Sequence, residues 1–358
     1  MKEIFNSYRL VCLTMLVVIT AVFTGGCSSE EKPAAEQRAK QIVTDSIGRK
    51  VEVPKPVKKV VVSNGYNTEL INALGAIDCV IGVDNGIYQN QDAYRGRFKP
   101  EQIIGQSQRE LNYEKIIELN PEVLILTGNG AWEDAEKKLG QFGIKVIVLD
   151  AYYTEHFKEN WLLAGQVFGK EKEALEMTAY FESKLAYIQK QLQGVPQKTL
   201  YFEYRREGNS TVPGDYFYKM VEYAGAKNIF DDAANVQVNP EAVVLRNPEF
   251  IVKVGSGTIS AQYLPPGSAE FAKRKKEIAA RAGWDEINAV KNGKILLLSH
   301  YSHGAASKLV GAMYIAKYLY PEYLPDLHPE QVFKEWLEKY QRLEYVSGHT
   351  DPPFSFAD

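Results

Sequence analysis

Side chains that could bind an organic ligand follow the predicted strands of this chain. Aromatic faces stack on flat organic groups, and arginines pair with carboxylates or catecholates. In open α/β sheets ligands bind beyond the carboxyl ends of the strands, so we expect a binding site in the loops after the β-branched runs. The expected ligand-binding residues are Asn64, Tyr66, Asn67, Tyr88, Arg109, Asn129, Trp132 and Tyr152 in the first half, and Tyr204, Arg205, Arg206, His300, Tyr301 and His303 in the second.

Some of these residues have other interpretations. The chain has 22 tyrosines, so a surface role is the alternative for any single one. Tyr216, Phe217 and Tyr218 are explained equally well by a helix start with one buried aromatic face. Because His300 and His303 stand three apart, either imidazole is a candidate ligand to iron or cobalt, with a polar pocket contact or a structural role as alternatives. No carboxylate lies close to them in sequence, so we assign no metal site.

The composition excludes several classes of protein. Of 358 residues 45% are apolar and 24% charged, which is typical of a globular protein, and the length suggests two domains. The net charge of −3 lacks the basic excess needed to bind nucleic acid, so we expect no such partner. The sequence has no G-x-S-x-G, H-E-x-x-H, phosphate-loop or CxxC motif, so we predict neither an enzyme nor a cofactor.

The N-terminus has the pattern of an export signal. Lys2 and Arg9 precede the apolar run Leu10 to Phe23, which is too short for a spanning helix but typical of a signal-peptide core, so we predict a signal peptide over 1–26. The small residues before Cys27 resemble the lipobox of bacterial lipoproteins, although a threonine stands where leucine is usual. An ordinary secretory signal is the alternative.

A lipid anchor agrees with the segment that follows. Residues 27–41 contain the stretch SSEEKPAAEQRAK, which has no aromatic residue and no apolar period, and we predict a lipidated N-terminus and flexible tether there. The protein would then be extracytoplasmic and held by a lipid on Cys27 at the outer face of the cytoplasmic membrane, which is the periplasmic side in a double-membraned envelope. Cys79 would be the single free thiol of the exported domain, in a buried apolar position.

Short β-branched runs alternate with helical patterns in the rest of the chain, which indicates an α/β fold with parallel strands. The runs are Val60 to Ser63, Val80 to Val83, Val123 to Leu126, Val146 to Leu149, Thr199 to Phe202, Ile251 to Val254 and Ile295 to Leu298. Asn67 or Thr68 is a candidate N-cap for the helix after the first run. Lys170 to Leu192 contains no Gly or Pro and has apolar residues at helical spacing, so we predict one long, stiff helix between two lobes.

The two halves also share an internal echo. Glu114 to Glu122 is EKIIELNPE and Glu241 to Glu249 is EAVVLRNPE, and apolar residues follow both. A helix that begins at a glutamate and ends at Asn-Pro-Glu, before a strand, fits both segments. We interpret the echo as a pseudo-symmetric pair of lobes. Chance resemblance between two ordinary α/β units is the alternative.

The order of these parts resembles the substrate-binding proteins of ATP-driven importers for ferric siderophores, haem and cobalamin. The resemblance covers Val43 to Tyr345, and its most specific pieces are TDSIGRKVEVPKPVKKVVV, ELNPEVLIL, the central helix and EYAGAKNIF. It implies two Rossmann-like lobes joined by one long helix, with one ligand in the cleft between the lobes. The expected organisation is a first lobe over 42–155, a helical connection over 156–195, a second lobe over 196–345 and a C-terminal tail over 346–358.

The resemblance also implies partners. These are an importer permease with its ATPase, and we expect the binding protein itself to be a monomer. In the family a glutamate near the start of a matching helix in each lobe docks onto permease arginines, and Glu114 and Glu241 match those places. The alternative is that both carboxylates merely complement the helix dipole.

The ligand remains open between several metal chelates. Arginines near strand ends favour an anionic ferric siderophore, and these are Arg95, Arg97, Arg109, Arg205 and Arg206. Cobalamin or another corrinoid, or haem, is the alternative ligand for the same kind of importer. A lipid-anchored enzyme and a carrier that works without a permease are the rival functions, and ligand turnover or the neighbouring genes would distinguish them.

Replacing Cys27 with Ser tests the predicted anchor. Because the lipid would be attached to the thiol, we expect a folded protein that no longer partitions with membranes in cell fractionation. Unchanged membrane fractionation of the variant would contradict the prediction.

Overall fold

The computed structural model describes residues 38–255, 263–299 and 307–356. The predicted signal peptide, Cys27 and the candidate ligand residues His300, Tyr301 and His303 lie outside these ranges. Within them, no helix is long and apolar enough to cross a membrane.

The first lobe is built on a parallel sheet with the strand order β4-β3-β7-β8. The strands are β3 (Val60–Val62), β4 (Val80–Val83), β7 (Val123–Leu126) and β8 (Lys145–Val148). Antiparallel pairs are formed by β1 (Lys40–Thr44) with β2 (Lys50–Pro54) and by β5 (Gly105–Ser107) with β6 (Glu110–Leu111). The helices are α1 (Gly65–Ala73), α2 (Asn85–Gln89), α3 (Tyr113–Leu119) and α4 (Trp132–Leu139). The folded body thus already includes Lys40, before the expected start at Ile42.

The second lobe has the strand order β10-β9-β11-β12-β13. The strands are β9 (Thr199–Tyr204), β10 (Lys227–Asn228), β11 (Phe250–Val254), β12 (Ile295–Leu298) and β13 (Thr350–Asp351). The helices are α7 (Tyr218–Tyr223), α8 (Pro240–Arg246), α9 (Ser268–Ala279), α10 (Asn288–Lys291), α11 (Ser307–Leu319) and α12 (Pro329–Glu335), followed by a π-helical turn over Trp336–Gln341. The two parallel sheets confirm the predicted α/β fold class.

The last residues of the chain contribute to the second sheet. We expected a tail over 346–358, but β13 pairs antiparallel with β12, and the Ser299 amide donates to the His349 carbonyl at 2.8 Å. The imidazole of His349 is buried, and this burial lowers its pKa to about 4. The histidine is therefore neutral at physiological pH and acts as part of the core.

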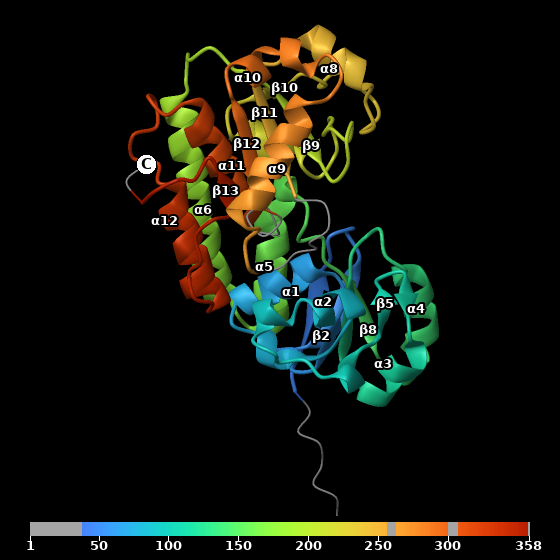
Figure 1. Ribbon diagram of the computed structural model, residues 1–358. Coiled ribbons are helices and arrows are strands. Elements are labelled where there is room, and N and C mark those ends of the chain that lie inside the picture. Colours follow the sequence, from blue (N-terminus) through green and yellow to red (C-terminus); the bar gives the residue numbers. More distant parts are fainter. Residues whose placement is uncertain (1–37, 256–262, 300–306, 357–358) are drawn as a thin grey trace, which may run out of the picture. The chain divides into compact units, whose positions relative to one another are not determined.

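The strands at the centre of both sheets are apolar because helices cover both of their faces. Every residue of β7, β11 and β12 is buried, as expected for parallel sheets that are shielded on both sides. Figure 1 shows this layering, with the first lobe in blue to teal and the second in yellow to red.

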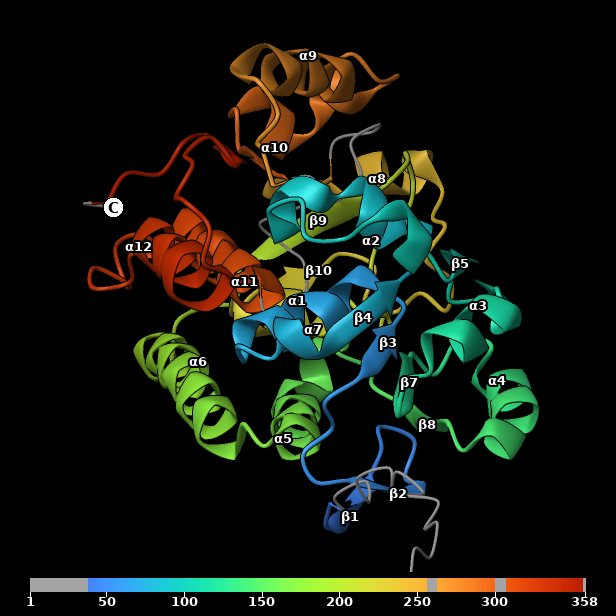
Figure 2. The ribbon, with the colours of Figure 1, turned by 90° about the horizontal axis from the view of Figure 1, so that it is seen from below.

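The connection between the lobes is helical, as predicted. After α5 (Phe157–Phe168), Gly169 has a φ of 65°, a left-handed conformation that suits glycine and turns the chain into α6 (Glu171–Gln191). Both ribbon views show α5 and α6 side by side (Figures 1 and 2). The ring centroid of Phe181 on α6 lies 5.4 Å from that of Trp161 on α5 and 6.0 Å from that of Trp336 in the C-terminal helices. The helix α6 is therefore packed between these elements rather than exposed as a linker.

The internal echo corresponds to two matching helices, α3 and α8. An asparagine caps each N-terminus, with Asn112 accepting from an amide of α3 and Asn239 from an amide of α8. Each helix ends at an asparagine in the left-handed region, with φ of 50° at Asn120 and 42° at Asn247. Proline follows both asparagines, and β7 or β11 begins shortly afterwards. The asparagine, together with the proline, terminates each helix.

The cap of α1 differs from the expected one. Asn64, with φ of 90°, accepts from the Tyr66 amide at 3.0 Å and is the N-cap. Asn67 and Thr68 lie inside the helix and are buried. The prediction was wrong because it placed the helix start after the strand's polar residues, whereas the chain turns directly from β3 into the helix.

Candidate functional site

Aromatic side chains of both lobes meet in one group, which we call the interlobe cluster. It consists of Tyr66, Tyr152, Tyr204, Tyr216, Phe217 and Lys308. The ring centroids of Tyr66 and Tyr152 are 6.4 Å apart, and those of Tyr152 and Tyr216 are 6.2 Å apart, so ring contacts pass from the first lobe to the second. The structure therefore brings together three of the expected residues, which come from the carboxyl ends of β3, β8 and β9.

Lys308 of α11 is the cation of the interlobe cluster. Its side chain is fully buried, and its ammonium donates to the Tyr152 carbonyl of the first lobe. The Nζ atom lies 4.7 Å from the Tyr216 ring centroid and 5.0 Å from that of Tyr66. Burial lowers the pKa of this amine to about 7, against the opposing influence of Asp215 and Glu69.

The tyrosines of the interlobe cluster are neutral phenols at physiological pH. Burial raises the pKa of Tyr66, Tyr152 and Tyr204, and it raises the pKa of Tyr216 to about 12. Tyr66 and Tyr216 are only partly buried, so part of each residue is accessible to solvent. They can therefore offer uncharged aromatic faces and hydroxyl groups to a ligand.

Arg205 adds an exposed positive charge beside the interlobe cluster. Its guanidinium carbon lies 6.0 Å from the Tyr204 ring centroid, and the charge counteracts the upward pKa shift of Tyr66. The neighbouring Arg206 is also exposed, and its Nε donates to the Asn209 side chain at 3.3 Å. Arg205 has a φ of 56°, a strained conformation for a residue with a side chain, so the loop after β9 needs support.

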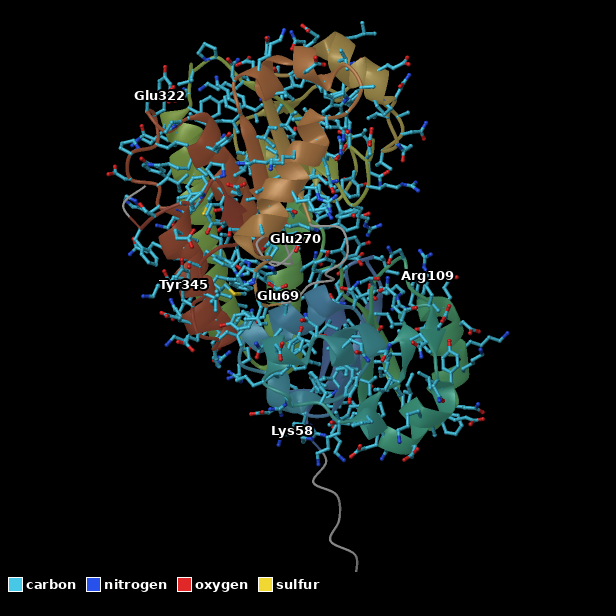
Figure 3. All side chains as sticks on the ribbon, in the orientation of Figure 1. Lys58, Glu69, Arg109, Glu270, Glu322 and Tyr345 are labelled. Carbon is cyan, nitrogen blue, oxygen red and sulfur yellow. The ribbon has the colours of Figure 1, made fainter. Side chains whose placement is uncertain are left out.

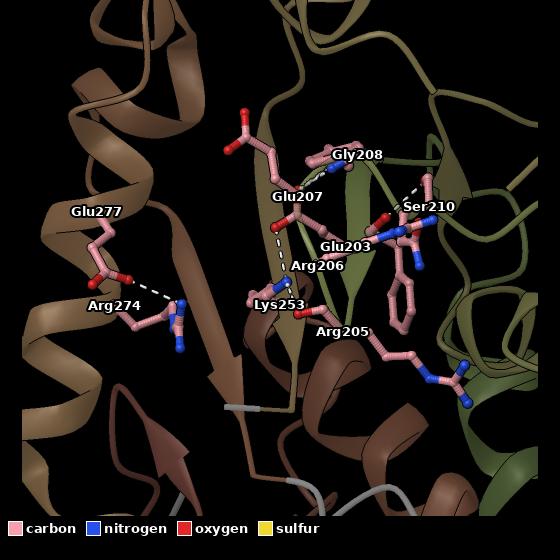
Figure 4. Close-up of polar contacts among 12 residues, drawn as sticks. Glu203, Arg205, Arg206, Glu207, Gly208, Ser210, Lys253, Arg274 and Glu277 are labelled. Atoms are coloured by element: carbon pink, nitrogen blue, oxygen red, sulfur yellow. Dashed lines mark hydrogen bonds and ion pairs between the residues drawn. The ribbon is translucent and has the colours of Figure 1, made fainter. Parts of the chain in front are cut away.

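A buried ion pair supplies that support. Glu203 is 1% exposed and Lys253 3% exposed, and their charged groups are 2.9 Å apart. Arg281 donates to both carboxylate oxygens of Glu203, at 2.8 and 3.0 Å, and Lys253 donates onward to the Arg205 carbonyl at 3.2 Å. Although burial opposes ionisation, Arg281 and Lys253 together lower the pKa of Glu203. Figure 4 shows Lys253 close to Glu203 and Arg205 in this network.

A polar network occupies the same edge of the first sheet. Gln108 donates to the Asn129 side chain at 2.7 Å and accepts from the Thr127 hydroxyl. Arg109 donates to the Asn129 carbonyl at 3.0 Å, and the Asn64 amide approaches Gln108 at 3.5 Å. Asn64, Arg109 and Asn129 are thus brought together, but without an aromatic partner. Figure 3 labels Arg109 on the side of the first lobe away from Glu69.

The remaining expected residues have other surroundings. Trp132 stacks with the Arg49 guanidinium, whose carbon lies 4.3 Å from the ring centroid, and packs on the core between β7 and α4. Tyr88 packs against the main core from α2. Asn67 is fully buried and accepts from the Ala151 amide at 3.3 Å, while its Nδ2 has no partner among the described residues.

The two expected docking residues are placed alike. Glu114 and Glu241 are each the second residue of their helices, α3 and α8, and both are exposed. In the part of the chain that the structure describes, neither carboxylate has an ion pair. Their position near a helix N-terminus also complements the helix dipole.

Sequence reasoning missed Lys253 and Lys308, two of the buried lysines. Lys253 interrupts the apolar strand FIVKV and Lys308 begins an apolar helix, and a lysine within a buried element is itself a signal, because burial of an unpaired charge is costly. No group of three or more His, Cys, Asp or Glu side chains suited to a metal occurs among the described residues.

Comparisons with known proteins agree with this architecture. The family model described as periplasmic binding protein matches residues 60–301. The chain is 26% identical over 294 residues to the uncharacterized ABC transporter substrate-binding lipoprotein YvrC of Bacillus subtilis, a match that covers 78% of this chain and 86% of YvrC. It is 23% identical over 302 residues to the petrobactin-binding protein YclQ of the same species, covering 80% and 90%.

A solved structure shows the same fold. The molybdate-binding protein MolA of Haemophilus influenzae, bound to molybdate, superimposes with a TM-score of 0.68 at 20% identity, over 86% of this chain and 99% of MolA. The shared fold of two α/β lobes is that of the two-lobed binding proteins. The chain belongs to the periplasmic binding protein family. It is a substrate-binding protein of the kind that serves ABC transporters and not an enzyme, as predicted.

Removing the charge of Glu203 tests how the loop after β9 is supported. In Glu203→Gln, Lys253 and Arg281 lose their shared counter-ion, so we expect the free energy of unfolding to fall by about 3 to 5 kcal/mol. Urea denaturation measures the difference. Glu207→Gln is the control, because this exposed carboxylate lies 3.5 Å from Arg281 and should contribute about 1 kcal/mol or less. Equal losses in both variants would contradict the role assigned to Glu203.

Proposed function

We propose that this protein is the extracytoplasmic binding lipoprotein of an ABC importer and that its ligand is a ferric siderophore. The ligand would bind where the lobes meet, against the exposed surface of Tyr66 and Tyr216 and beside Arg205. Delivery to a permease and its ATPase would follow, with the protein held at the membrane by a lipid on Cys27.

The interlobe cluster is the observation that carries this proposal. It combines neutral aromatic rings from both lobes with the positive charge of Arg205 and the buried amine of Lys308. Siderophore chelates of iron are flat or globular organic groups that often carry net negative charge, which matches stacking surfaces flanked by cations. The sequence similarity to the petrobactin-binding protein YclQ supports the same ligand class.

Cobalamin or haem is the alternative ligand. Either one would also use aromatic surface, and vitamin B12-binding proteins are among the relatives, at 24% identity over 54% of this chain. Haem shares anionic carboxylates with many siderophores, whereas cobalamin offers amides. The two cations at the interlobe cluster therefore favour an anionic chelate over cobalamin.

A titration with a small ligand panel tests the ligand. Binding is measured by the change in tryptophan fluorescence. We expect a ferric tris-catecholate siderophore to bind more tightly than haemin, cyanocobalamin or molybdate. Tyr66→Ala and Arg205→Ala should each weaken that binding by about 1 to 3 kcal/mol, because they remove a stacking surface and a charge. Phe142→Ala, which truncates an exposed ring of the first lobe, is the control. Unchanged affinity in both site variants would refute the site.

Charge reversal tests the permease partner. Glu114→Lys or Glu241→Lys should impair uptake and permease-stimulated ATP hydrolysis, and the double variant should be worse, since like charges across an interface cost several kcal/mol. Ligand affinity in solution should stay within a factor of about 3, under 1 kcal/mol, because neither side chain lies near the interlobe cluster. Glu176→Lys, an exposed position on α6, is the matched control. Normal transport by the double variant would contradict the docking role and leave both glutamates only with the role of complementing the helix dipole.

A further inference from the structure

Lys308 has fewer partners than a buried ammonium requires. An ammonium group carries three N–H donors, and within the described part of the chain one acceptor is present, the Tyr152 carbonyl. The rest of its surroundings are ring faces, with centroids 4.7 Å away at Tyr216, 5.0 Å at Tyr66 and 5.2 Å at Phe217. These rings stabilise a cation through their quadrupoles but do not neutralise it.

Among the described residues, no carboxylate forms an ion pair with Lys308. Asp215 and Glu69 favour the charged amine only through space. Asp215 already accepts from the Thr211 hydroxyl at 2.7 Å and from the Phe217 amide at 3.1 Å. The tyrosines stay neutral, and Arg205 brings a like charge. Burial therefore dominates, and it lowers the pKa of Lys308 to about 7.

The two cations of the site should respond differently to a ligand. Arg205 is exposed to solvent, and it is an arginine, the residue type that pairs with carboxylates and other anions. The amine of Lys308 is buried against the rings of Tyr66 and Tyr216, and the burial that lowers its pKa to about 7 leaves it partly neutral in the free protein. A negative charge placed on the accessible side of these rings would stabilise its protonated form, since electrostatic interactions are strong in a poorly solvated site.

We propose that Lys308 is the charge-selecting residue of the site, and that an anionic chelate bound against Tyr66 and Tyr216 takes up one proton from solvent onto the Lys308 amine. The step forms one N–H bond on the amine lone pair and converts it to an ammonium, with the buffer as proton donor. A neutral ligand would gain nothing from this protonation. The inference rests on the proposed function, and it adds a residue that discriminates anionic from neutral ligands.

Calorimetry in two buffers tests the proposal directly. A ferric tris-catecholate siderophore is titrated at pH 8 in phosphate and in Tris, whose ionisation enthalpies differ, so the difference in heat counts the protons taken up. We expect the full-length protein to take up a large fraction of one proton with this probe and none with cyanocobalamin. In Lys308→Met the uptake should vanish and the affinity for the siderophore should fall by about tenfold or more.

The control is a second buried lysine on the same helix. Lys317 of α11 donates to the Leu324 carbonyl at 2.9 Å and lies outside the interlobe cluster. Lys317→Met should leave both the proton uptake and the siderophore affinity unchanged. Equal uptake by wild type and Lys308→Met would overturn the proposal and assign the proton to another group. Equal siderophore affinity in these two proteins would overturn it as well.

Stability measurements show whether Lys308→Met is folded and whether the amine titrates as inferred. Because the pKa in the folded state lies below the ordinary value for lysine, the unfolded chain holds more protons between about pH 7 and 10, and the free energy of unfolding should rise with pH over this window. Lys308→Met should lack that rise. If wild type binds no anionic chelate, the proposed function fails and the proton-uptake inference fails with it. Binding without proton uptake defeats the inference alone.

Discussion

The packing of Phe181 between Trp161 and Trp336 is the contact on which the arrangement of the two lobes depends. Trp161 belongs to the helix that leaves the first lobe, and Trp336 belongs to the C-terminal helices of the second, so α6 is clamped by both. A single apolar cluster runs from the strands of one sheet to those of the other. Dense packing of this kind resists continuous deformation. The junction can therefore hold the side chains of the interlobe cluster, which come from both lobes, in fixed positions.

Polar contacts reinforce the same junction from the first lobe. Asn72 of α1 donates to the Gln341 carbonyl at 3.1 Å, Gln341 donates back to the Glu69 carbonyl at 3.1 Å, and the Arg342 guanidinium donates to the Asn72 carbonyl at 2.6 Å. These bonds tie the helix that carries Tyr66 to the end of the second lobe. A large hinge movement would break them together with the packing on α6, so ligand capture should involve side chains and loops more than a rotation of the lobes.

The sequence predicted the fold well because its signals are local. Each signal determines an element close to it in the chain. The apolar β-branched runs form strands, the segment without Gly or Pro forms the long helix, and the repeated Asn-Pro-Glu ends a helix in each lobe. It predicted the site only in part, since Tyr66, Tyr152 and Tyr204 gather as expected whereas Trp132 packs against Arg49. Which residues meet across two lobes depends on long-range packing that strand ends do not encode. Lys308 and the support from Glu203 were missed for the same reason, although a lysine within an apolar element was a usable signal.

Lys253 and Lys308 show how a buried lysine, which costs free energy to desolvate, can serve either stability or binding. Lys253 has a full counter-ion in Glu203, and Arg281 completes the pairing, so its charge is satisfied inside the folded chain. Within the described part of the chain, Lys308 has one backbone carbonyl and several rings as partners, and no carboxylate pairs with it. If the proposal for Lys308 holds, an anionic ligand would supply the negative charge that balances its ammonium form where the two lobes meet.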